Sequence, residues 1–94
     1  MTPQKVIDQT HHYEAQLIGL NIPRVRIEPK RTFGSLTNEE ILSHAHHLCR
    51  NIPEYAGNPE QWGKANRHYA SLQMCLSMAN WLTLDAMMAD NKPG

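Results

Sequence analysis

The sequence is poor in the residues and motifs that most often reveal an enzyme. It has two cysteines in 94 residues, too few for a disulfide scaffold, and five glycines that form no phosphate-binding cluster. It contains no HExxH or CxxC metal motif and no nucleophile elbow. We therefore expect no catalytic residue and no bound cofactor, and we predict a protein that is not an enzyme.

An excess of charge of either sign is also lacking. Nine Lys and Arg residues balance nine Asp and Glu residues, so the formal net charge is zero, whereas a general nucleic-acid binder carries a basic excess. No apolar run approaches the ~18 residues that a membrane span needs. Residues 1–20 lack the apolar core of a signal peptide, so we expect a cytoplasmic protein that makes no membrane contact.

Apolar residues recur every three or four positions along residues 2–20, 37–51 and 58–80, which predicts three main helices. A fourth, short helix is predicted over 83–91. Residues 21–36 contain two prolines and a glycine, and we interpret them as a surface connector. The chain, residues 1–94, is therefore predicted to be a single all-α domain, a small bundle of three main helices and a short C-terminal one.

The ends of these helices carry local signals. Threonines at positions 2, 37 and 83 are predicted N-caps, and Glu40 would complete a capping box with Thr37. Pro53 should end or kink the second helix near Asn51. Asn80 is a plausible left-handed residue at the end of the third helix.

The short link between the second and third helices predicts an antiparallel hairpin. Heptad positions place His44 and His68 together at its edge, with His47 one turn from His44. Three imidazoles with an open position would suit zinc or another divalent transition metal, so a metal-binding protein is an alternative function. In the simpler interpretation His44 and His68 lie at the boundary of the core, while His46 and His47 are surface residues.

The two cysteines are not expected to form a redox pair. In the predicted hairpin, the residue opposite Cys49 lies near position 62, so Cys75 is roughly 20 Å away along the helix. A disulfide requires Cα atoms within about 7 Å. Both thiols are therefore predicted to be small core residues.

Residues 24–31, RVRIEPKR, carry four basic side chains and one acidic side chain. They could bind phosphate or an acidic partner, which makes a nucleic-acid-binding regulator the second alternative function. We favour a solvated connector instead, because Glu28 lies within the cluster and the whole chain is neutral.

Trp81, Met87 and Met88 are the predicted contact with a partner chain. A chain of this size buries only somewhat more than ~60% of the surface of its unfolded state, so a second copy would add to its stability. The predicted function is accordingly a small, non-enzymatic protein–protein interaction or accessory module. Its partner would be a second copy, in a homodimer, or another protein.

Four motifs in order, HAHHLC (44–49), KANRHYASLQ (64–73), LTLD (82–85) and NKP (91–93), resemble those of a group of small, functionally uncharacterised helical proteins. Proteins of this group are found in bacteria and in bacteriophages. The resemblance covers about residues 37–93. It implies a helical fold and an accessory role of phage or prophage type, and it assigns no catalytic residue.

A binding experiment separates the connector from a nucleic-acid site. We expect no measurable binding of random duplex or single-stranded DNA at ~150 mM salt by fluorescence anisotropy, because four phosphate contacts alone are too few to compete with salt ions. Saturable binding with a log–log salt slope of about −4, lost in the variant Arg24→Ala/Arg26→Ala, would instead establish the regulator.

Overall fold

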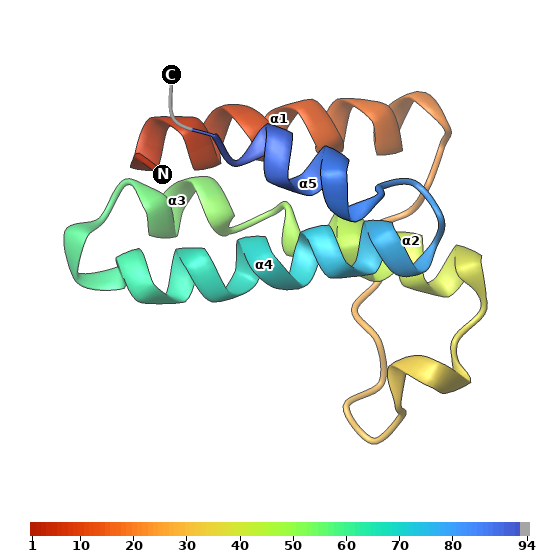
Figure 1. The fold of residues 1–94 in the computed structure, drawn as a ribbon. Helices are drawn as coiled ribbons and strands as arrows, with labels where there is room; N and C mark the ends of the chain where they lie inside the picture. Colours follow the sequence, from red (N-terminus) through yellow and green to blue (C-terminus); the bar gives the residue numbers. More distant parts are fainter. Residues whose placement is uncertain (93–94) are drawn as a thin grey trace.

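Helices make up all the regular structure of the fold (Figure 1). The computed structural model describes residues 1–92, and within them it contains no β-strand. The elements are α1 (Pro3–Gly19), η1 (Phe33–Ser35), α2 (Asn38–Leu48), α3 (Ile52–Ala56), η2 (Pro59–Gln61), α4 (Trp62–Met78) and α5 (Leu84–Asp90), where η marks a turn of 3-10 helix. The prediction of an all-α chain is confirmed.

The threonine N-caps lie where the sequence predicts them. The hydroxyls of Thr2, Thr37 and Thr83 each accept a hydrogen bond from the backbone N–H three residues further along. Each bond satisfies one of the unpaired donors at the start of a helix. At α2 the Glu40 carboxylate also accepts from the Thr37 N–H at 3.0 Å, so the capping box is complete.

Two asparagines end the long helices in the left-handed conformation. Asn21, after α1, has a φ of 58°, and Asn80, after α4, has a φ of 68°. The turn at Asn80 lets the Trp81 N–H bond to the Leu76 carbonyl at 2.8 Å, which closes the end of α4. The predicted left-handed role of Asn80 is confirmed. The last residue of the NKP motif, Pro93, lies outside the described residues.

The predicted second helix ends three residues earlier than expected, and a short helix that was not predicted follows it. α2 ends at Leu48 and α3 begins at Ile52, so the expected span of 37–51 is corrected. In a continuous helix the ring of Pro53 would clash with the Cys49 carbonyl four residues earlier. Pro53 lies instead in the first turn of α3, where its missing N–H needs no partner. Residues 1–92 therefore contain five α-helices rather than four.

α4 is central to the packing, since it contacts α1, α2 and α3. Figure 1 shows α5 lying across α1 and α4 on the near side of the view, and the chain reversing direction between α3 and α4. The core between these helices is filled by large side chains that are at most 1% exposed: Tyr13, Leu17, Ile52, Leu72 and Leu76. No helix within residues 1–92 has both the length and the apolar character needed to cross a bilayer.

α2 is buried more completely than an amphipathic helix would be. Every residue from Ile41 to His46 is buried, including the polar Ser43, His44 and His46. An amphipathic helix normally leaves one face in water. α2 instead packs against α4 and α1, and residues 22–28 of the connector lie along it and bond to it. Its polar side chains must therefore find partners inside the fold.

α5 is attached to the rest of the fold mainly by polar contacts, because none of its residues is buried. The Tyr13 hydroxyl donates to Asp90 Oδ2 at 2.6 Å. The side-chain amides of Gln73 and Asn91 exchange two hydrogen bonds of 2.9 and 3.0 Å, and the Tyr69 hydroxyl donates to Asn91 Oδ1 at 3.0 Å. These bonds join the C-terminal end of α5 to both α1 and α4.

Two residues of α4 give a matched test of this packing. Leu76 is fully buried and Met74 is 53% exposed, although both are large apolar residues on one helix. We expect Leu76→Ala to lower the free energy of unfolding by about 2–5 kcal/mol, and Met74→Ala to change it by less than about 1 kcal/mol. Chemical denaturation measures both values, and equal losses would contradict the packing described.

Candidate functional site

The histidines of HAHHLC differ in environment. His44 is buried, and its Nδ1 accepts a hydrogen bond from the Ile27 N–H at 3.2 Å, so its own proton lies on Nε2. His46 was predicted to lie at the surface, and this prediction is wrong because the residue is only 5% exposed. Its Nδ1 donates to the Ile22 carbonyl at 2.7 Å, and its Nε2 is buried with no partner among residues 1–92.

The three histidines of the metal-binding alternative are only partly brought together. The rings of His44 and His47 stack with 5.7 Å between centroids. The ring of His68 packs edge-on against Tyr55 at 5.3 Å, and its Nδ1 donates to the Lys64 carbonyl at 2.9 Å. Within residues 1–92, no three His, Cys, Asp or Glu side chains are grouped in a way that would hold a metal ion.

Burial and neighbouring positive charges lower the pKa values of both His44 and His47. Burial lowers the pKa of His47 most, and the charge of His68 is among the groups that lower it further. For His44, burial is again the main cause of a lowered pKa, followed by His47 and Arg26.

The connector is fixed to α2 at three successive points. The Ile22 carbonyl accepts from His46, the Val25 N–H donates to the Ser43 carbonyl at 3.2 Å, and the Ile27 N–H donates to His44. Residues 22–28 adopt no helix or strand, so these bonds replace the regular backbone pairing that the segment lacks. The segment lies at the surface as predicted, since none of residues 22–28 is buried, and these bonds tie it to the most buried helix.

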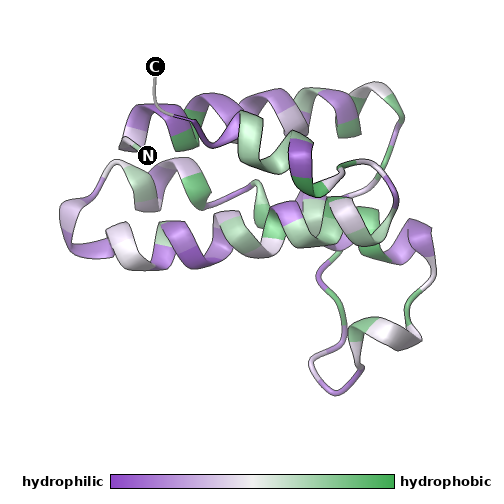
Figure 2. Ribbon diagram, in the orientation of Figure 1, coloured by the Kyte–Doolittle hydropathy of each residue, from purple (hydrophilic) through white to green (hydrophobic). Residues whose placement is uncertain are grey.

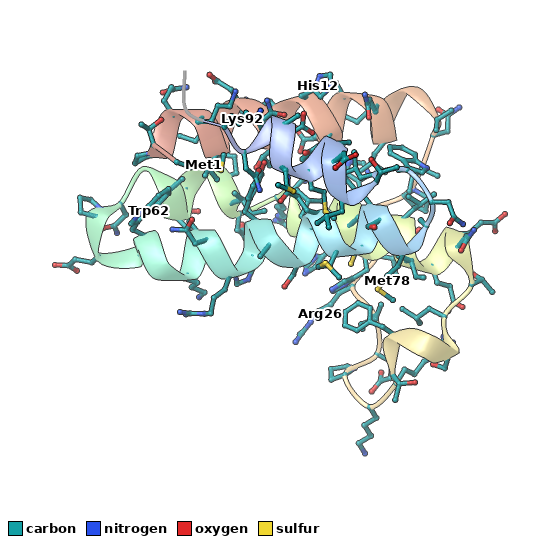
Figure 3. The ribbon with its side chains drawn as sticks, in the orientation of Figure 1. Met1, His12, Arg26, Trp62, Met78 and Lys92 are labelled. Carbon is teal, nitrogen blue, oxygen red and sulfur yellow. The ribbon has the colours of Figure 1, made fainter. Side chains whose placement is uncertain are left out.

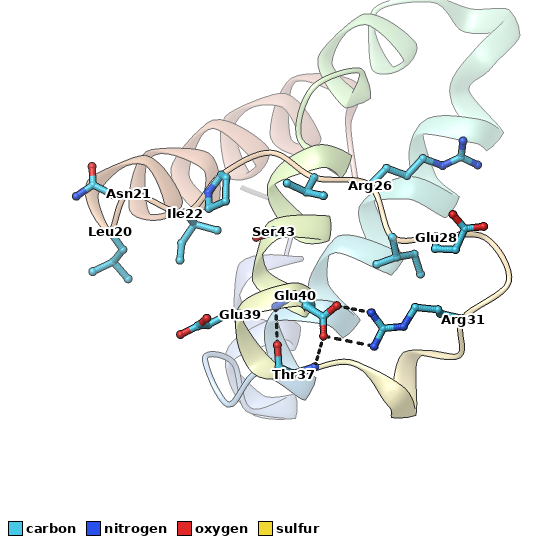
Figure 4. A pocket seen from close by; sticks show the side chains of 13 residues that line it. Leu20, Asn21, Ile22, Arg26, Glu28, Arg31, Thr37, Glu39, Glu40 and Ser43 are labelled. Atoms are coloured by element: carbon cyan, nitrogen blue, oxygen red, sulfur yellow. Dashed lines mark hydrogen bonds and ion pairs between the residues drawn. The ribbon is translucent and has the colours of Figure 1, made fainter.

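Carboxylates pair with two of the four cations in residues 24–31. Arg24 forms an ion pair with Glu14 of α1, and Arg31 binds both carboxylate oxygens of Glu40 (Figure 4). Arg31 also donates to the Ser35 carbonyl at 2.7 Å. The Arg31 guanidinium is the main cause that lowers the pKa of Glu40. The basic cluster is therefore partly neutralised by contacts within the chain.

A hollow of about 620 Å³ lies where the connector passes the first turns of α2 (Figure 4). Its lining mixes apolar residues such as Val25 and Ile27 with the acidic Glu28 and Glu39 and the basic Arg26. No single kind of group dominates it, so its chemistry selects no class of ligand.

A second hollow, of about 250 Å³, is lined almost entirely by apolar groups, and we call it the α4 groove. It is formed by Phe33, Ala70, Ser71, Met74, Cys75 and Met78. The groove lies along the C-terminal half of α4. In Figure 2 the ribbon of α4 changes from hydrophilic to hydrophobic colours toward that half. Figure 3 shows Met78 and Arg26 on the side of α4 from which the connector extends.

The sequence alone does not identify the exposed side chains of the α4 groove as a site. Phe33, Met74 and Met78 are 38%, 53% and 42% exposed. The available signal was a pair of methionines four residues apart beside the apolar seam of the helix. The sequence around the methionines does not reveal the contribution of Phe33, because this residue belongs to η1, about forty positions earlier. Its ring packs against that of His44, with 5.6 Å between the ring centroids.

The residues predicted to form an interface have unequal exposure. Trp81 is half-buried and packs against the core, and Met87 is also half-buried. Met88 is 58% exposed and lies one turn from Leu84, which is 67% exposed. α5 therefore carries an apolar patch formed by Leu84 and Met88, to which the half-buried Trp81 adds little free surface.

Both thiols lie in the core, as predicted. Cys49 and Cys75 are free and are 1% and 2% exposed. Burial raises the pKa of the Cys49 thiol to about 12 and that of Cys75 to about 11. Neither group is ionised near neutral pH, so neither provides the thiolate that nucleophilic chemistry needs.

Comparison of the chain with protein-family models, with curated proteins and with solved structures finds no match.

Thiol reactivity tests the described burial. At pH 8 we expect both thiols of the native protein to react with an aromatic disulfide reagent at least about 100-fold more slowly than in the unfolded chain, since raised pKa and burial both suppress the thiolate. Absorbance at the released thiol's wavelength gives the rates. Rapid reaction of one equivalent in native buffer would contradict the placement of that cysteine.

Proposed function

We propose that the chain is a small, non-enzymatic protein–protein interaction module that pairs with a second copy of itself through the α4 groove. The observation that carries this proposal is the exposed apolar lining of that groove, with Phe33, Met74 and Met78 each more than one-third exposed. Apolar side chains gathered at one surface are typical of a protein contact. The resemblance of the 44–49 and 64–73 motifs to bacteriophage proteins supports an accessory role.

The shape of the α4 groove favours a second copy as the occupant. Met74 and Met78 project from adjacent turns of α4, while a hollow opens between this helix and Phe33. A surface with both a projection and a hollow can be self-complementary, so in a two-fold dimer the methionines of each copy would enter the hollow of the other. Methionine suits this role because its flexible, polarizable side chain adapts to the facing surface.

Charge does not oppose the pairing. The formal net charge is zero, so two copies have no overall repulsion to overcome. Full burial of one methionine side chain contributes about 1.5–3 kcal/mol, so a few such residues make a meaningful contact.

The proposal includes an antiparallel arrangement of α2 and α4, which would frame the groove. Two contacts support it. Phe33, just before α2, lies with Met74 and Met78 near the end of α4, and Tyr55 of α3 lies against His68 in the first half of α4. This arrangement would bring the η1 turn onto the apolar half of α4 and so form the groove.

No observation favours either alternative function, metal binding or nucleic-acid binding. A metal site would need a third ligand beside the stacked His44 and His47, and the ring of His68 packs on Tyr55. A nucleic-acid site would need Arg24 and Arg31 free, and both are bound to carboxylates.

Sedimentation of two matched variants tests the proposal. We expect the native protein to dimerise at tens of micromolar, and Met74→Gln/Met78→Gln to raise the dissociation constant by about tenfold or more, because each polar amide would be desolvated in the contact. The control, Leu84→Gln/Met88→Gln, changes the equally spaced apolar pair on α5 and should leave the dimer unchanged. Thermal unfolding checks that both variants remain folded.

Two results would contradict the proposal. A native protein that is strictly monomeric up to several hundred micromolar would rule out self-association of useful affinity. Dissociation caused by the α5 variant alone would move the contact to the surface around Met88.

A further inference from the structure

His44 has a hydrogen bond that only a neutral imidazole can make. Its Nδ1 accepts from the Ile27 N–H at 3.2 Å, which uses the lone pair of an unprotonated nitrogen. His46, two residues later, makes the opposite kind of bond, since its Nδ1 donates to the Ile22 carbonyl at 2.7 Å. A proton added to His44 removes its bond to the connector, whereas a proton added to His46 leaves its donor in place.

The same imidazole also contacts a wall of the α4 groove. The edge of the Phe33 ring packs on His44 with 5.6 Å between centroids, and Phe33 lines the groove beside Met74 and Met78. His44 therefore contacts the chain at Ile27 and again at Phe33. The exposed loop between these two residues has one further tie to α2, the ion pair of Arg31 with Glu40.

We propose that neutral His44 acts as a pH-sensitive latch that holds residues 27–33 on α2, and that protonation of His44 releases this segment and changes the α4 groove. The release of residues 27–33 is inferred from the contacts of His44 alone. The further effect, a change in self-association through the α4 groove, rests on the function proposed above.

The groups around His44 oppose its protonation. On α2 itself, His47 stacks on its ring at 5.7 Å, and Glu40, one turn earlier, is neutralised by Arg31. From the connector, Arg26 adds a positive charge, and from η1 the neighbour is the uncharged Phe33. On the side of α4, the groove residues next to Phe33 are uncharged, and the one titratable group among them is the buried Cys75 thiol.

The direction of the pH effect follows from these surroundings. Burial, then His47 and Arg26, lower the pKa of His44 below its ordinary value of 6.5. When the segment is released, the pKa of His44 returns toward 6.5, so the released state binds protons more readily than the latched state. The latch is fully favoured above pH 6.5 and weakens as pH falls from 6.5 toward the lowered pKa, by up to about tenfold in the released-to-latched ratio for each pH unit.

Amide exchange at Ile27 measures the latch directly. Between pH 7.5 and 5 we expect the protection factor of the Ile27 N–H to fall by up to about tenfold per pH unit below 6.5. The Ile22 N–H, which bonds to the Leu17 carbonyl at the end of α1, is the internal control and should not show this step. Long-range proton–nitrogen NMR correlations at pH 7 should place the His44 proton on Nε2.

Two variants distinguish titration from packing. In His44→Asn the amide oxygen can take the place of Nδ1 as an acceptor that does not titrate, so Ile27 should stay protected without the pH step. In His44→Ala the acceptor is lost, so protection should be low at every pH. His47→Asn removes the stacked neighbour but keeps the latch, and its pH step should remain.

The outcomes separate the latch from the proposed function. The latch is wrong if native protein and His44→Asn show the same pH dependence at Ile27, or if His44 carries its proton on Nδ1. Measured at a concentration where the protein is monomeric, a pH step at Ile27 upholds the latch whether or not the chain dimerises. If it dimerises, the dissociation constant should change several-fold between pH 7.5 and 5.5 in native protein and stay constant in His44→Asn. A constant value in both would overturn the coupling to the groove.

Discussion

The burial of α2 on nearly all its faces is the constraint on which the rest of the structure depends. A helix that buries six consecutive residues, Ile41 to His46, loses stability for each polar group left without a partner, because an unsatisfied buried donor or acceptor costs on the order of 1–3 kcal/mol. The connector supplies partners through bonds at Ile22, Val25 and Ile27, although the Nε2 of His46 keeps none among residues 1–92. A segment without regular structure, none of whose residues is buried, thereby becomes fixed to the interior helix that it covers.

The position of the connector in turn determines the surface. Because Ile27 is fixed to His44, the chain that follows returns to α2 close by, and Phe33 comes to rest on the same imidazole. The Phe33 ring then completes a hollow beside Met74 and Met78 on α4. One packing arrangement therefore places His44, which accepts the hydrogen bond of the Ile27 N–H, next to the apolar groove proposed for self-association.

α5 is held in place by different interactions from those of the other helices. It buries no residue and depends on hydrogen bonds from Tyr13, Tyr69 and Gln73 to its last residue and to Asn91. Such a polar cluster fixes orientation but contributes little apolar burial, so Leu84 and Met88 remain in solvent. The α4 groove and the α5 patch are both exposed apolar regions, and the groove differs from the patch in having a hollow beside its projecting side chains.

The sequence by itself determined the features that depend on neighbours a few residues away. These are the helical class, the threonine caps, the left-handed Asn80 and the interruption at Pro53, all of which follow from local hydrogen bonds and backbone sterics. Burial of Cys49 and Cys75 followed from helical periodicity. Tertiary structure alone decided that His46 is interior, that His68 packs on Tyr55, and that Phe33 meets Met78. The reason is that the connector has no periodicity to reveal which face of α2 it covers, so the surroundings of those side chains are set by segments distant in the sequence.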